Sequence, residues 1–269
     1  MGRFKLSIEY EGTRYSGWQQ QKNARTVQGE ILGVLRKVFG AAEIEFQGAG
    51  RTDSGVHALC QVAHLDVKTM LAPEIIRMRM NDELPADINI LEVGKAPAGF
   101  HARHDAVARS YLYQISRRRT AFGKRYVWWI KDPLDAAVME KAASMFVGLK
   151  DLQSFTADEP EEKSTSVLIS SIEMKKSADL ILIRIVGSHF LWKLVRRVVG
   201  VLAEAGRGRL SAEEIARYLR EPSEEPARTT APPSGLFLER VYYPGDRPLR
   251  ELRPVLDIST PALPDRTDR

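Results

Sequence analysis

The chain has 269 residues, of which 43% are hydrophobic and 28% charged, and its 40 lysines and arginines exceed its 35 aspartates and glutamates by five. This composition is that of a folded, water-soluble protein with one large domain or two ordinary ones, and it excludes a wholly disordered, collagen-like or membrane-embedded chain. The single cysteine, Cys60, excludes an intrachain disulfide and a thiolate-rich metal site, and its apolar neighbours favour a buried thiol.

No apolar segment approaches the roughly 18 to 20 residues that a transmembrane helix needs, and the first seven residues lack the apolar core of a signal peptide. We therefore expect a cytoplasmic protein without a membrane partner. Basic residues form short runs, such as Arg117 to Arg119 and Lys193 with Arg196 and Arg197. Such runs suit a polyanionic partner, although a solvated cationic surface has the same pattern.

The first predicted element is a strand over Phe4–Tyr10, where apolar and polar residues alternate before a turn. Thr26 is placed to cap a helix whose apolar residues keep the 3.6-residue spacing up to Phe39, and Gly40 is placed to end it. Further strands are predicted at Ile44–Phe46, Gln61–Val67, Ile88–Val93, Ser110–Ser116, Val127–Ile130, Val167–Met174 and Leu180–Val186.

Three more helices are predicted in the second part of the chain. Asp132 and Pro133 indicate the start of one that Gly148 would close, an apolar stripe from Leu191 to Leu202 indicates another that ends at Gly206, and Ser211 with Glu214 indicates a capping box for the last. This order of strands and helices predicts an α/β or α+β layered fold. We expect two comparable halves, 1–105 and 106–246, and a proline-rich polar tail over 247–269 that wraps the surface or is disordered.

The segment from Gly48 to Ala58 carries three glycines within eight residues and lies between two predicted strands, which predicts a sharply bent loop. Asp53 occupies the position where a dinucleotide-binding fingerprint needs its third glycine, so that function is excluded. Arg51 and Asp53 point to the same side in an extended backbone, where the guanidinium would keep the carboxylate ionised. The spacing fits a nucleophilic aspartate, and it equally fits an ion pair that only tethers the loop.

Three other side-chain patterns leave a structural and a functional interpretation open. Tyr111 and Tyr113 share one strand face, where they would pack in a sheet or stack on a base. Arg196 lies off the apolar stripe of its helix and would face a cleft or solvent. His101 and His104 have a spacing that suits a metal, but no acidic or thiolate partner completes a set, so we expect no metal site.

The stretch Gly50-Arg51-Thr52-Asp53-Ser54-Gly55-Val56-His57-Ala58 resembles the signature of the TruA-type tRNA pseudouridine synthase family. Other stretches resemble that family in the same order, over most of residues 3–245. They are Ile8–Thr13 with Gly17–Gln19 and Thr26–Gln28, Phe100–Arg103 with Arg109–Tyr113, Phe190–Gly200, and Ala231–Leu236.

The resemblance implies an isomerase that converts uridine to pseudouridine at positions 38, 39 and 40 of the tRNA anticodon stem-loop, without a cofactor. It implies an α+β fold of two RRM-like (ferredoxin-like) halves, with a mainly antiparallel sheet around a central basic cleft, and a homodimer that binds tRNA across both subunits. In its site, Asp53 is the nucleophile, Arg51 helps to hold the flipped-out nucleotide, and Arg196 pairs with Asp53. Tyr111 stacks on the base and assists loss of the C5 proton, and Leu236 packs near the base.

The chain departs from the family pattern at two positions, because Val167 replaces a common arginine and Leu152 a usual phenylalanine. These departures would affect RNA contacts or the choice of target. Two other functions stay open. One is an RNA-binding module in which Asp53 only tethers its loop, and the other is a hydrolase of glycosidic bonds, which normally needs a second carboxylate.

Overall fold

The computed structural model describes residues 2–40, 43–158, 164–256 and 258. Its centre is one continuous sheet in the order β4-β1-β3-β10-β5-β9-β8-β7, with β2 paired to β3 and β6 to β5. The pairs β10–β3 and β5–β6 are parallel, and the other pairings among the described strands are antiparallel. The strands are β1 (Gly2–Tyr10), β2 (Ile44–Gly48), β3 (His57–Val67), β4 (Ile88–Lys95), β5 (Ala108–Ser116), β6 (Trp128–Trp129), β7 (Gly148–Asp151), β8 (Ser166–Ser177), β9 (Leu180–Gly187) and β10 (Leu236–Tyr242).

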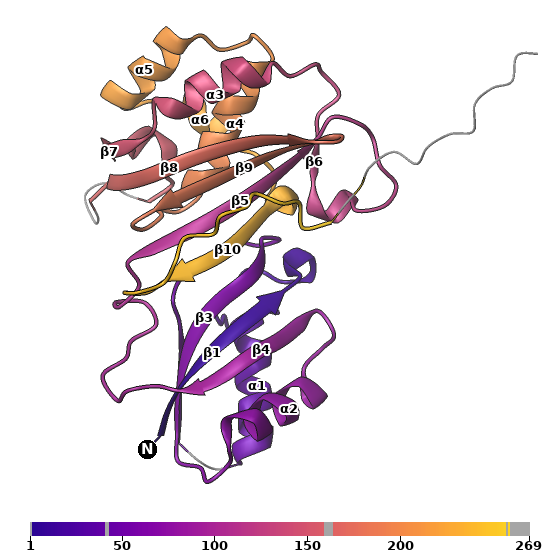
Figure 1. The fold of residues 1–269 in the computed structure, drawn as a ribbon, viewed down its shortest axis with the longest axis vertical. Coiled ribbons are helices and arrows are strands. Elements are labelled where there is room, and N and C mark those ends of the chain that lie inside the picture. The colour runs from indigo at the N-terminus through magenta and orange to yellow at the C-terminus, as the bar shows by residue number, and fades with distance from the viewer. Residues whose placement is uncertain (1, 41–42, 159–163, 257, 259–269) are drawn as a thin grey trace, which may run out of the picture.

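The helices divide between two ends of this sheet, and β10 lies between β3 and β5 (Figure 1). The first end carries α1 (Val27–Phe39) and α2 (Pro73–Glu83). The second end carries α3 (Ala136–Ser144), α4 (Leu194–Gly206), α5 (Ala212–Arg220) and α6 (Glu225–Arg228). The structure is thus the mixed α+β fold with a mostly antiparallel sheet that the sequence predicts.

Two apolar cores lie beneath these helices and meet at Tyr111, whose ring packs against both. In one core Leu6 of β1 packs with Leu35 of α1, and in the other Ile183 of β9 packs with Val199 of α4. Each of these four side chains is fully buried. Because burial of an aliphatic side chain stabilises by about 1.5 to 3 kcal/mol, these cores fix the helices on the sheet, and the boundary between them is the place for a cleft.

The tail after β10 covers part of the other face of the sheet (Figure 1). Leu252 and Ile258 are buried there against Leu112 and Phe237. Residues 257 and 259–269 lie outside the described residues. In the described part, the tail therefore packs against the sheet.

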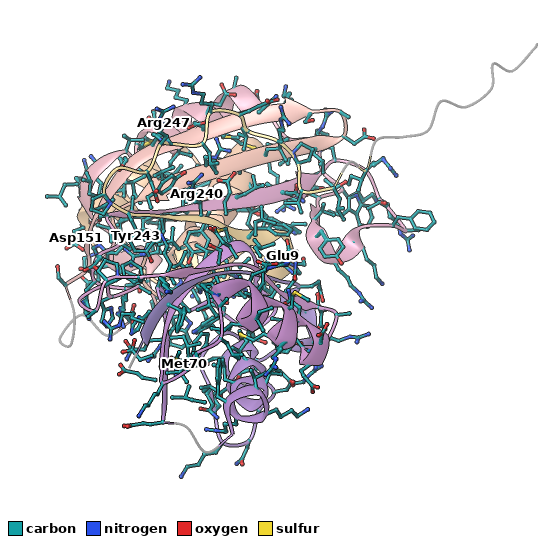
Figure 2. The ribbon with its side chains drawn as sticks, turned by 60° about the horizontal axis from the view of Figure 1, so that its bottom comes forward. Glu9, Met70, Asp151, Arg240, Tyr243 and Arg247 are labelled. Carbon is teal, nitrogen blue, oxygen red and sulfur yellow. The ribbon has the colours of Figure 1, made fainter. Side chains whose placement is uncertain are left out.

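The junction of the two halves is also held by the residue that follows β10. Figure 2 shows Tyr243 at this junction, and its hydroxyl donates a 2.6 Å hydrogen bond to the carbonyl of Ala102. The same view shows Met70 on the loop between β3 and α2, far from this junction and fully exposed. The two halves are therefore joined by hydrogen bonds and by packing as well as by the sheet.

Local signals placed the ends of two helices correctly. The Thr26 hydroxyl accepts the Gly29 N–H at 3.2 Å at the start of α1, and Gly40 follows its last residue with φ of 64°. Ser211 and Glu214 form the expected capping box of α5. Both ends depend on contacts within four residues, which a sequence pattern can specify.

The predicted helix from Asp132 to Gly148 is wrong at both ends. Asp135 caps α3 instead, because its carboxylate accepts the backbone N–H groups of Ala137 at 2.9 Å and Val138 at 3.1 Å. Asp132 pairs with Arg207 at 3.0 Å. Gly148 begins β7 with φ of 101°, so the helix ends earlier, at Ser144.

Candidate active site

The glycine-rich loop leaves the sheet where β3 changes its neighbour. Residues 63–67 of β3 pair with β2, whereas residues 57 and 58 pair with β10. The loop between β2 and β3 therefore emerges between β2 and β10, at the boundary of the two cores. It forms one wall of a cleft of about 960 Å³.

Close contacts fix the backbone on both sides of Asp53. The Thr52 hydroxyl hydrogen-bonds the Tyr10 hydroxyl at 2.8 Å, and the backbone carbonyl of Thr52 accepts the Trp18 N–H at 3.1 Å. A side chain at Gly17 would bring a Cβ within 2.6 Å of that carbonyl, and Gly17 also has φ of 89°. Gly55 has φ of 78°, so glycine is required at both positions.

The Asp53 carboxylate lies 3.2 Å from the guanidinium of Arg196. Both side chains are mostly buried, with 23% and 15% of their surfaces exposed. The Arg196 Nε donates to the carbonyl of Ala231 at 2.7 Å, and the Ala231 N–H donates to the carbonyl of Arg196 at 3.0 Å. Arg196 lies near the start of α4, and the chain before β10 holds its side chain in place. Its Nη1 donates to the Asp53 carboxylate.

The expected pair of Arg51 and Asp53 is wrong. Arg51 is exposed and lines the same cleft, but among the described residues the ion-pair partner of Asp53 is Arg196. The loop is instead tethered by the backbone contacts around Thr52. This removes the hypothesis that an Arg51–Asp53 ion pair is what holds the loop.

Tyr111 and Leu236 form the apolar wall of the cleft. The ring of Tyr111 on β5 meets that of Phe190 edge-on, with 4.9 Å between their centroids, and Leu236 at the start of β10 is 4% exposed. Burial, and then the nearby Asp53 charge, raises the pKa of the Tyr111 hydroxyl, which stays protonated at neutral pH. Tyr113 shares this strand face as predicted but is fully buried, and its hydroxyl donates to the Pro232 carbonyl at 2.8 Å.

Cations outnumber carboxylates among the described residues that line the cleft. These include five basic side chains and two acidic ones, namely Arg51, Arg103, Arg109, Lys193 and Arg196 against Asp53 and Asp158. Arg109 is structural in part, because its guanidinium donates to the carbonyls of Ala49 and Ser188. The cleft can thus accept an anionic ligand beside an apolar wall.

Several lining residues were not predicted as site residues, among them Trp192, His189 and Phe190. All three come directly before α4. Trp192 and Phe190 belong to the stretch Phe190–Gly200 that resembles the family, which was the available signal. An exposed tryptophan next to a positive-φ residue is visible only in the structure.

The two departures from the family pattern lie in the core. Val167 and Leu152 are at most 1% exposed and pack beneath α3 and α4. Neither side chain therefore offers a surface that RNA could contact directly, and the effect of the two departures on RNA binding or target choice stays a prediction. Cys60 is partly buried, and burial raises the pKa of its thiol.

The rings of His101 and His104 lie 4.2 Å apart. Within the described ranges, no group of three or more histidine, cysteine, aspartate or glutamate side chains is arranged to hold a metal ion. A search of those same residues finds no helix with the length and apolar character to span a membrane.

Comparison with known proteins defines the class. A family model described as tRNA pseudouridine synthase matches residues 6–105 and 142–244, which include the cleft residues Asp53 and Arg196. The chain belongs to the tRNA pseudouridine synthase family, whose members are isomerases.

Curated relatives match nearly the whole chain. The tRNA pseudouridine synthase A of Halalkalibacterium halodurans is 38% identical over 242 residues, which cover 89% of this chain and 92% of that protein. The proteins of the same name from Nitrobacter hamburgensis and Rhodopseudomonas palustris are 38% and 39% identical over 246 residues, covering 90% of this chain and all of theirs. The similarity therefore includes both halves and the segments that carry Asp53 and Arg196.

Proposed function

We propose that this chain isomerises uridine to pseudouridine at positions 38, 39 and 40 of the tRNA anticodon stem-loop, with Asp53 as nucleophile. The observation that carries the proposal is the Asp53–Arg196 pair, 3.2 Å apart in a cleft with an apolar wall, whose described lining has more cations than carboxylates. Tyr111 and Leu236 form that wall. Asp53, Arg196 and Leu236 lie in segments that the family model matches.

The order of elements supports two RRM-like halves, 1–105 and 106–246. The first runs β1-α1-β2-β3-α2-β4, and its strands pair in the order β4-β1-β3-β2. In the second, β5, α3, β8, β9, α4 and β10 follow one another, with the strand order β10-β5-β9-β8. The two orders are equivalent, and this β-α-β-β-α-β arrangement is that of ferredoxin-like units.

The chemistry requires a flipped-out nucleotide and a carboxylate that stays ionised. Flipping costs a few kcal/mol, which cationic contacts with phosphates must offset. Asp53 attacks either the uracil ring or the ribose C1′, and the bond between N1 and C1′ breaks. The uracil turns, C5 bonds to C1′, and the bond to Asp53 breaks and returns its electron pair to the carboxylate. The C5 proton leaves and N1 gains one, so atoms and charge balance without a cofactor.

The other site residues serve this reaction by position and charge. Arg196 holds the Asp53 side chain in one orientation and stabilises its negative charge. Arg51, exposed at the cleft, is free to contact the displaced RNA backbone. Tyr111 is a protonated phenol in an apolar wall, which favours stacking on the uracil over service as the base for the C5 proton.

A homodimer in the cytoplasm that binds tRNA across both subunits is part of the same proposal. The basic cleft supports a polyanionic partner, and the family resemblance supports the dimer. Analytical ultracentrifugation of the protein alone and with tRNA tests it. A sedimentation coefficient of one chain at micromolar concentration would contradict the dimer.

The test of the reaction is release of tritium from an unmodified tRNA transcript labelled at uridine C5, with no added metal or cofactor. Release together with pseudouridine in the digested RNA supports the isomerase, and mapping of the product locates the target positions. RNA binding without release would favour a non-catalytic RNA-binding module.

A hydrolase would release free uracil. The second carboxylate on the described cleft lining is Asp158, whose Oδ2 already accepts the Trp192 N–H at 2.8 Å. A carboxylate engaged in this way is less suited to the second role in glycosidic hydrolysis. Isomerisation therefore fits the site better than hydrolysis.

A further inference from the structure

Trp192 is a large aromatic side chain left half exposed at the mouth of the cleft. Its side chain lines the same cavity as Asp53 and Arg196, and 51% of the residue is accessible to solvent. Trp18, by contrast, packs in the core and is only 1% exposed. What distinguishes Trp192 from Trp129, which is 42% exposed, is its place in the lining of the cleft, where an aromatic face can stack on a flat ligand.

The backbone around Trp192 is fixed by three hydrogen bonds. Its N–H donates to the Asp158 carboxylate at 2.8 Å, and its carbonyl accepts the Ala157 N–H at 3.0 Å and the Thr156 hydroxyl at 3.2 Å. The backbone that carries the indole is therefore held in place. A backbone fixed in advance lowers the conformational entropy that is lost when a flat ligand stacks on its side chain.

The next residue adds a charge and a strained backbone. Lys193 has φ of 62°, a left-handed conformation that lysine rarely adopts, at the N-cap of α4. Its ammonium lies 4.7 Å from the centroid of the Trp192 ring. Strain of this kind persists mainly at functional sites. Here it places a cation against the indole, within the lining of the cleft.

We propose that Trp192 stacks on an unpaired base that neighbours the target nucleotide, while Lys193 contacts the phosphate of that base. This inference rests on the proposed function and adds to it a residue that positions the RNA. An aromatic face combined with a cation is the usual means of binding single-stranded RNA, since any base can stack and any phosphate can pair. The chain thereby holds the loop of the RNA open beside Asp53.

The first experiment compares Trp192→Leu with Trp192→Phe on an anticodon stem-loop transcript. Loss of the ring raises KM by about 5- to 100-fold with kcat changed less than about threefold, and phenylalanine restores most of the affinity. Trp129→Leu is the matched control, because Trp129 is 42% exposed and does not line the cleft. An unchanged KM in Trp192→Leu would overturn the proposal, as would equal losses in the leucine and phenylalanine variants.

The second experiment removes the base instead of the ring. Transcripts with an abasic nucleotide on either side of the target uridine are assayed with the wild type and with Trp192→Leu. If Trp192 stacks on the base that is removed, the abasic transcript raises the KM of the wild type by about the same factor as Trp192→Leu raises it on the intact transcript. The abasic transcript with Trp192→Leu then shows no further increase in KM. Independent losses at both positions would show that Trp192 does not contact these bases.

Failure of the stacking proposal and failure of the proposed function give different results. If wild-type protein forms no pseudouridine at any RNA concentration, the proposed function is wrong. If it turns over normally and Trp192→Leu has the wild-type KM, only the role of Trp192 is wrong. Quenching of the Trp192 fluorescence by RNA, taken as the difference between wild type and Trp192→Phe, is a readout that does not depend on turnover.

Discussion

The carboxylate of Asp53 lies 3.2 Å from the guanidinium of Arg196, although 143 residues separate them in the chain. One comes from the loop between β2 and β3, and the other from the first turn of α4. The shared sheet brings them together, because β10 pairs with both β3 and β5. The site therefore forms only when both halves fold, and neither half alone contains it.

Replacement of Asp53 by asparagine removes the charge and keeps the shape. We expect turnover, measured as tritium release, to fall by at least about a thousandfold, because an amide cannot attack the nucleotide. Affinity for tRNA is expected to stay within about threefold of the wild type. Asp82→Asn, on an exposed turn of α2, is the control and keeps full turnover. Turnover within about tenfold of the wild type in the asparagine variant would remove Asp53 from the mechanism.

Arg196→Lys tests whether orientation matters as well as charge. The guanidinium of Arg196 bonds the Ala231 carbonyl through Nε and Asp53 through Nη1, and the ammonium of a lysine cannot reproduce this geometry. We therefore expect kcat to fall about a hundredfold with a smaller change in KM. The lost bond to Ala231 should lower the free energy of unfolding by about 1 kcal/mol. Arg220→Lys, on the exposed side of α5, is the control. Wild-type kcat in Arg196→Lys would show that a point charge is enough.

The sequence predicted the elements that local contacts specify. The helix α1 has a capping threonine, an apolar stripe and a terminal glycine, and all three are visible within 15 residues. The helix α2 was missed because it buries only Ile76 and Met80, and its N-cap residue Ala72 makes no side-chain hydrogen bond. The strand β10 was missed because its neighbours lie more than 100 residues away in the chain.

The resemblance predicted the site residues and the pairing of Arg196 with Asp53, whereas local spacing alone pointed to Arg51. The resemblance pointed to Asp53, Tyr111, Arg196 and Leu236, and all four line one cleft. Arg51 was the nearer cation in the sequence, yet Arg196 is the partner, because the choice depends on how α4 packs against the loop. No local pattern contains that information.

A buried ion pair between Arg184 and Glu239 provides a test of stability away from the site. Their side chains are 2% and 8% exposed and are joined by hydrogen bonds of 2.7 and 2.8 Å. Glu239→Gln leaves the arginine charge buried without a full partner, so we expect the free energy of unfolding to fall by about 3 kcal/mol. Glu173 contacts the same arginine but is 47% exposed, so Glu173→Gln should cost less than about 1 kcal/mol. Equal losses in urea denaturation would contradict this.

Stability should decrease below pH 6.5 because of His57. Burial lowers the pKa of His57 below its ordinary value of 6.5. Both ring nitrogens have partners when the ring is neutral, because Nδ1 accepts the Gly12 N–H at 2.9 Å and Nε2 lies 3.0 Å from the Arg125 carbonyl. The unfolded chain therefore binds this proton at a higher pH than the folded chain. The contribution is complete above pH 6.5 and is lost as the pH falls through the folded pKa.

The measurement is the free energy of unfolding at pH 7 and pH 5 in the wild type and in His57→Asn. We expect the wild type to lose on the order of 1 kcal/mol more than the variant over this range, although the variant is less stable at pH 7. His104→Asn, at an exposed position, should keep the wild-type slope. Identical slopes in wild type and His57→Asn would show that this histidine does not couple folding to pH.

Affinity for tRNA should depend steeply on salt, because the cleft lining is rich in cations. We expect binding to weaken at least about tenfold between about 50 and 200 mM monovalent salt, as counterions released from the RNA phosphates are restored. Arg103 lines the cleft with an exposed side chain, so Arg103→Gln should reduce the slope of log affinity against log salt by about one. Arg220→Gln, on α5, should leave the slope unchanged. A flat profile in the wild type would mean that phosphate contacts do not offset the cost of flipping the nucleotide.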